Sequence, residues 1–131
     1  MASAPVFAVT PKFTHARIST ANTNRDGTGT LGTIATGTTS GSYVMRIVAT
    51  ATVTTTAGML RFFVHDGSNF RAWREVPVTA ITVAASTPAF TTIISSPVPG
   101  EPLLILPSGY TIQVGTHNAE SFDVVTMVMD F

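Results

Sequence analysis

The chain has 131 residues, of which 44% are hydrophobic and only 11% are charged. Seven lysine and arginine residues balance seven aspartate and glutamate residues, so no net charge would draw the protein as a whole to nucleic acid or to an anionic membrane. A chain of this length can bury one core, and so weak a charge predicts association with its own copies or with a larger assembly. Because there is no cysteine, a disulfide framework and thiol chemistry are excluded.

The N-terminal stretch predicts an extended arm over residues 1–12, in front of one domain over residues 13–131. It contains Pro5 and Pro11 and little periodic pattern. Four apolar residues in and next to the arm are expected to contact a neighbouring subunit or a shell: Val6, Phe7, Val9 and Phe13. The arm lacks the charged start and unbroken apolar run of a signal peptide, and no later run has the roughly 18 apolar residues of a membrane span. We therefore expect assembly in a cytosol, with no membrane partner.

The rest of the chain predicts an all-β fold. It is rich in β-branched residues, including 23 threonines, and apolar residues recur with period two rather than 3.6. Turn-forming residues separate eight or nine short strands, with some neighbouring stretches joined as one bent strand, at 13–19, 30–36, 43–54, 59–65, 70–76, 78–84, 90–95, 103–106, 110–115 and 122–130. Many short strands with Gly and Pro turns are typical of a sandwich or barrel, and eight strands favour a jelly roll.

The last predicted strand, 122–130, is apolar on both faces. Phe122, Val124 and Val128 alternate with Asp123, Val125, Met127 and Met129. A strand with two apolar faces is expected to be central in its sheet or covered on both sides.

One short stretch, "HDGS" at 65–68, brings together the residue types of a catalytic triad. A triad is usually assembled from distant segments, whereas His65, Asp66 and Ser68 share one turn, and Asp-Gly is a hairpin signal. The stretch therefore predicts a turn.

Other candidate sites also have simpler explanations. The stretch from Asn22 to Thr33 resembles a calcium loop but lacks the final glutamate, which favours an Asx-rich turn. His117, Glu120 and Asp123 would share a helical face, yet they lie in a loop that enters a strand. The sequence thus predicts no catalytic residue, no metal site and no cofactor, and the protein is not expected to be an enzyme.

The hairpin "FFVHDGSNFRAW" at 62–73 has two possible registers. A loop with an odd number of residues would place Leu60, Phe62 and Val64 beside Phe70, Ala72 and Val76, which makes one apolar face, so we favour it over an even loop. The opposite face would then be a contact surface of Arg61, Phe63, His65, Arg71 and Trp73, together with Glu75. Arginine and tryptophan are enriched at interface hot spots. Ordinary amphipathic surface, or a tryptophan that belongs to the core, is the alternative.

Three stretches carry a family resemblance: "ISTANTNRDGTGT", "TTTAGMLRFFVHDGSNFRAWREVPVTAI" and "LILPSGYTIQVGTHNAESFDV". Together they resemble small virion proteins of tailed bacteriophages, from about residue 13 to the end. Proteins of this size and kind include capsid decoration (cement) proteins, which are β-sandwich or β-barrel trimers on the head lattice. The resemblance implies a homotrimer that binds the major capsid protein, stabilises the head and resides in the virion after assembly in the bacterial cytoplasm. A tail or head-fibre component that binds host glycans, with Trp73 or Tyr110 at the site, is the alternative.

Overall fold

Nine antiparallel strands form the regular structure of residues 7, 8 and 10–131, which are the residues that this computed structural model describes. The same residues contain no helix, so the prediction of an all-β protein is confirmed. The strands are β1 (Thr10–Ile18), β2 (Gly32–Thr36), β3 (Ser42–Ala51), β4 (Gly58–His65), β5 (Phe70–Val78), β6 (Thr91–Ser95), β7 (Leu104–Leu106), β8 (Thr111–Thr116) and β9 (Phe122–Asp130).

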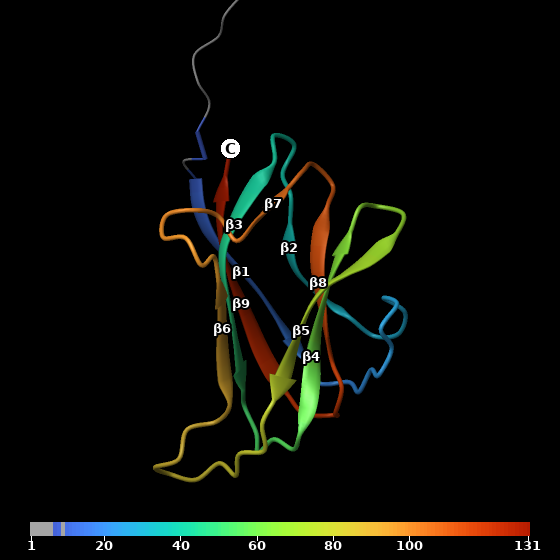
Figure 1. The fold of residues 1–131 in the computed structure, drawn as a ribbon, viewed down its shortest axis with the longest axis vertical. Coiled ribbons are helices and arrows are strands. Elements are labelled where there is room, and N and C mark those ends of the chain that lie inside the picture. The colour runs from blue at the N-terminus through green and yellow to red at the C-terminus, as the bar shows by residue number, and fades with distance from the viewer. Residues whose placement is uncertain (1–6, 9) are drawn as a thin grey trace, which may run out of the picture.

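The strands lie in two sheets that pack face to face as a sandwich (Figure 1). The five-stranded sheet has the order β1-β9-β3-β6, with β7 also paired to β3, and the four-stranded sheet has the order β2-β8-β4-β5. If β7 is set aside, each sheet has four strands, and the chain passes from one sheet to the other as it does in a jelly roll. This agrees with the jelly-roll-like sandwich that the sequence predicts. β9 is central, since it pairs with β1 on one side and with β3 on the other.

The core forms from the side chains that point inward between the two sheets, which alternate with outward-pointing ones along each strand. One group of aliphatic and aromatic side chains fills the space between the sheets, including Val44, Ile47, Phe62, Ile112 and Val124, each completely buried. Burial of apolar surface is the main driving force for such a fold. In β9 the period-two alternation of the sequence matches this arrangement, because Phe122, Val124 and Val128 are buried while Val125 and Met127 are only partly buried.

Two of the predicted strands differ most from the structure. The first strand begins at Thr10 rather than 13, because residues 10–12 already pair with the end of β9, and so part of the expected arm belongs to the sheet. The predicted strand at 78–84 is absent. β5 continues through Pro77 to Val78, and the chain then crosses to β6 through an irregular connection. Thr55 anchors this connection, because its backbone pairs with Ile81 and its hydroxyl donates to the carbonyl of Thr79.

Candidate functional site

The hairpin of β4 and β5 combines both of the registers that the sequence allows. Its loop has four residues, so His65 lies opposite Phe70 and Val64 opposite Arg71, as in the even register. A bulge in β5 then shifts the pairing by one residue, and Leu60 lies opposite Val76 as in the odd register. Trp73 is the residue that the bulge leaves without a direct partner. The preference for an odd loop is therefore wrong at the tip and right below the bulge.

The bulge divides the predicted contact surface between the two faces of the hairpin. Arg61, Phe63 and His65 lie on the face away from the core, where Arg61 is 5% exposed and Phe63 1% exposed. Arg71 and Trp73 lie toward the other face. The Trp73 ring meets the Phe62 ring edge to face at a centroid distance of 6.2 Å and packs against the core. The structure thus places these five residues on no common exposed surface, and Trp73 contributes to the core.

Buried Arg61 is held by partners from two other segments. Its Nε donates to Oε1 of Glu75 in β5 at 3.3 Å, and its Nη1 lies 3.2 Å from Nδ1 of His117 after β8. Arg25 reaches the same Glu75 carboxylate at 3.0 Å. A buried guanidinium must be paired to offset its lost hydration. Glu75 and His117 provide this pairing, so the cluster links their segments to β4, and Arg61 is not available to an external partner.

The turn after β4 explains the cluster of His65, Asp66 and Ser68. Oδ1 of Asp66 accepts hydrogen bonds from the backbone N–H groups of Asn69 and Ser68, at 2.7 and 2.9 Å. These bonds hold the pKa of Asp66 below its usual value. Nδ1 of His65 accepts from the N–H of Gly67 instead of approaching the serine hydroxyl. The three residues therefore form a turn, as predicted.

The segment 19–31 also forms turns. Asn22 is buried, and its Nδ2 donates to the carbonyls of Thr28 and Thr30, both at 2.9 Å. Asp26 accepts from the hydroxyl and the N–H of Thr28, which lowers its pKa. The segment lies over the four-stranded sheet: a Cβ added to Gly115 in β8 would come within 2.9 Å of the Leu31 side chain.

The other candidate metal ligands are not brought together. Glu120 accepts a hydrogen bond from the N–H of Thr56, Asp123 pairs with Arg17, and His117 contacts Arg61. Among residues 7, 8 and 10–131, no three His, Asp or Glu side chains are grouped as metal ligands would be.

Two of the four predicted apolar arm contacts can be located. Val6 and Val9 lie outside the described residues. Phe7 and Phe13 are 68% and 66% exposed, the two most exposed large apolar side chains in the described part of the chain. Phe13 belongs to β1 rather than to an arm, and it projects from the sheet on the side away from the core.

That outer face of the five-stranded sheet carries apolar side chains from β1 across to β6. Ile93 in β6 and Ile105 in β7 are 61% and 57% exposed, so no described segment covers them. Between these edges and β1, most outward positions of β9 are apolar, but the same face also carries exposed Arg46 in β3 and the ion pair of Arg17 and Asp123. The apolar side chains of the outer face are Phe13, Val48, Ile93, Ile105, Val125, Met127 and Met129. An exposed apolar surface that spans several strands is typical of an association site.

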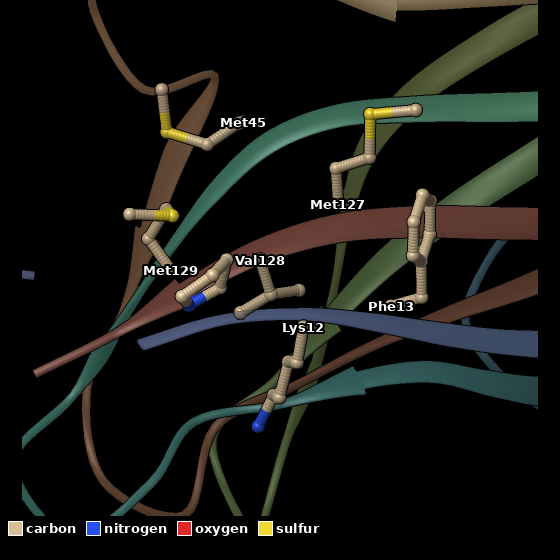
Figure 2. A pocket seen from close by; sticks show the side chains of 7 residues that line it. Lys12, Phe13, Met45, Met127, Val128 and Met129 are labelled. Carbon is tan, nitrogen blue, oxygen red and sulfur yellow. The ribbon is translucent and has the colours of Figure 1, made fainter. Parts of the chain in front are cut away.

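A hollow of about 290 Å³ opens on this face between the start of β1 and the end of β9. We call it the methionine groove, and its walls include Pro11, Phe13, Met45, Met127 and Met129. Met45 is the extra residue of a bulge in β3. Figure 2 shows Met127 beside Phe13, its partner across the strands, with the side chains of Met45 and Met129 further along.

One ion pair lies on the outer face and another at the end of β9. Nζ of Lys12 lies 2.8 Å from Oδ2 of Asp130, which also accepts from the Ser42 hydroxyl at 2.6 Å. Burial raises the pKa of Asp130, but the hydrogen bonds from Lys12 and Ser42 and the charge of Lys12 outweigh it, so the pKa lies below its usual value. Arg17 binds the Asp123 carboxylate through both oxygens, at 2.6 and 3.0 Å, and lowers its pKa. The two acids are therefore ionised and paired at neutral pH.

Comparisons with protein-family models, with curated proteins and with solved structures find no match to this chain. Separately, no helix in residues 7, 8 and 10–131 has the length and apolar character to cross a membrane.

Sequence reasoning did not identify the outer face as a surface. The sequence did contain a signal for this surface, namely the second apolar row of the last strand, Val125, Met127 and Met129. From that row we predicted only that the strand is central or covered on both sides. β9 is central, but its second row is left uncovered by the described residues. A doubly apolar strand in a sandwich with one core is itself an indication of an external partner.

Proposed function

We propose that this protein is a structural component of a tailed-bacteriophage head, of the decoration (cement) type. In this role it associates with itself, as the trimer that the resemblance implies, binds the major capsid protein lattice and stabilises the head. It would reside on the capsid surface after assembly in the host cytoplasm.

The broad outer face of the five-stranded sheet is the observation that carries the proposal. A protein that lies against a shell needs a wide contact area, and the outer face offers one with exposed apolar side chains from β1 to β6 and charged groups, including Arg46, among them. The jelly-roll-like sandwich is compatible with this role, since viral capsid domains use that architecture, although many unrelated functions share it. The alternative of a glycan-binding fibre receives less support, because the Trp73 ring is already in contact with other side chains of the protein. It packs edge to face with Phe62, and the guanidinium carbon of Arg74 lies 4.9 Å from its centroid.

Binding to heads tests the proposal directly. Heads of the phage that carries the gene, prepared without this protein, are mixed with purified protein, and bound copies are counted after sedimentation and by cryo-electron microscopy. Wild-type protein is expected to saturate regular lattice positions and to raise the temperature at which heads release DNA. Ile93→Lys, which places a charge on the outer face, should lower occupancy at least tenfold. The control Val83→Lys changes a partly exposed valine in the connection between β5 and β6 and should bind as wild type. Absence of binding to heads, or binding to tails or fibres only, would refute the assignment.

A further inference from the structure

The methionine groove has the size and chemistry of a receptor for an aromatic side chain. Its volume of about 290 Å³ exceeds the roughly 150 Å³ of an apolar protein cavity that holds benzene. Three of its walls are thioether side chains, Met45, Met127 and Met129. Methionine adapts its shape to a ligand, and its sulfur makes favourable contacts with aromatic rings.

The chain itself supplies an aromatic side chain of this kind next to the groove. Phe7 precedes Pro11, a wall of the groove, by four residues, so it can extend about 13 Å from the groove's edge. Phe7 is 68% exposed, which shows that it does not occupy the groove of its own chain. From Thr10 onward β1 runs extended along the groove, and Pro11 and Phe13 are among the residues that line it.

We infer that the methionine groove binds Phe7 of a second copy of this protein, so that the copies are linked by exchange of their N-terminal ends. The balanced charge of the chain opposes no such contact. The groove and Phe7 are different surfaces of one chain, so the contact is heterologous and closes into a ring when every copy both gives and receives a phenylalanine. A trimer satisfies this condition, as do other ring sizes. The inference concerns self-association alone and holds whether or not the protein binds a head.

Site-directed disulfide formation tests the contact without interference, because the chain has no cysteine of its own. A Phe7→Cys chain and a Met127→Cys chain of different mass are mixed under mild oxidation. The expected product is a mixed disulfide of one chain of each kind. The control mixture combines the Phe7→Cys chain with a Val83→Cys chain, whose changed residue lies in the connection between β5 and β6. This mixture should form no more mixed disulfide than the background of random collisions. In the double variant Phe7→Cys/Met127→Cys, a disulfide formed mainly within one chain would overturn the inference in favour of the chain's own groove.

Sedimentation velocity of the intact protein gives the second readout. Wild-type protein should be oligomeric, and Phe7→Ala should weaken self-association by roughly thirtyfold or more, the effect of losing a buried aromatic anchor. Met127→Lys should do the same from the groove side, while Ile105→Lys, at another exposed position of the outer face, should leave the oligomer intact. A monomeric wild-type protein, or Phe7→Ala and Met127→Lys variants that assemble as well as wild type, would overturn the inference. The latter result would leave the groove to an aromatic side chain of a different protein.

Discussion

Thr14 and Thr126 lie directly opposite each other in β1 and β9, and only one of their hydroxyl groups has a partner. The Thr14 hydroxyl donates to the carbonyl of Ile34 in β2, which ties the two sheets together at this edge. Thr126 is fully buried, and its Oγ1 has no hydrogen-bond partner in the described structure. A buried polar group without a partner costs folding free energy, because it loses its hydrogen bonds to water.

The first prediction uses this pair as its own control. Thr126→Val keeps the shape of the side chain and removes the unpaired hydroxyl, so it should raise the free energy of unfolding by about 1 kcal/mol. Thr14→Val removes a hydroxyl that is bonded and leaves the Ile34 carbonyl without its partner, so it should lower stability by about 1 kcal/mol. Urea denaturation followed by far-UV circular dichroism measures both. Destabilisation by Thr126→Val would mean that its hydroxyl has a partner in solution, such as a buried water.

The second prediction concerns Trp73, which the sequence places on a contact surface and the structure places against the core. Trp73→Ala should lower the free energy of unfolding by about 2 kcal/mol, since a partly buried indole loses its contact with Phe62. If the protein self-associates as proposed, the folded variant should do so to the same extent as wild type. Arg74→Ala is the matched control, because it removes only the exposed guanidinium near the indole ring. Denaturant midpoints and sedimentation velocity separate the two roles. A stable variant that has lost self-association would restore Trp73 as an interface residue.

The fold was predictable because its determinants are local. Strand length, turn residues and period-two burial can all be read from neighbouring positions, and they identified most of the strands with ends within a few residues. The predicted strand at 78–84 failed for a non-local reason. Its backbone groups bond to Thr55 in a different connection rather than to a neighbouring strand, and a single sequence contains no trace of that pairing.

The site was harder to predict because it depends on register. One extra residue in a strand moves every later side chain to the other face, and the bulge beside Trp73 does this within the hairpin. The sequence contains both registers as alternatives but no local signal for a switch between them. The sequence predicts Phe13 as an apolar contact residue, but it could not place Phe13 in β1, because that position depends on pairing with β9, more than a hundred residues away in the chain.

The third prediction tests Asn22 as the organiser of segment 19–31. Asn22→Asp keeps the size of the side chain but replaces the amide that donates to the carbonyls of Thr28 and Thr30 with a buried carboxylate. Stability should fall by about 2 kcal/mol, because two carbonyls lose a donor and a charge is buried beside them. Amide hydrogen exchange within 22–31 should accelerate more than exchange in β9. Asn24→Asp, at an exposed neighbour with one side-chain hydrogen bond to Thr28, should have little effect on either measurement. Equal effects of the two variants would show that Asn22 has no special role.

The last prediction is a pH dependence that arises at Asp130. Its pKa in the folded protein lies below the usual value of 3.8, because Lys12 and Ser42 stabilise the ionised carboxylate against the effect of burial. A lowered folded-state pKa means that the ionised group stabilises the fold fully above the unfolded pKa, and that this contribution is lost as the pH falls through the folded pKa. Asp130→Asn removes the contribution at every pH. The difference in unfolding free energy between wild type and Asp130→Asn should therefore be constant from pH 7 to about pH 5 and shrink below pH 4.

Urea denaturation of both proteins between pH 7 and pH 3 measures this difference. Asp26, Asp66 and Asp123 also have lowered pKa values and are present in both proteins, so their acid destabilisation cancels in the comparison. Glu101→Gln, in the exposed connection between β6 and β7, is the control and should differ from wild type by a small amount at all pH values. A gap between wild type and Asp130→Asn that widens as the pH falls would contradict the assignment. The carboxylate would then be held at the edge of the outer face at a net cost, and the contacts of Lys12 and Ser42 would not compensate for its burial.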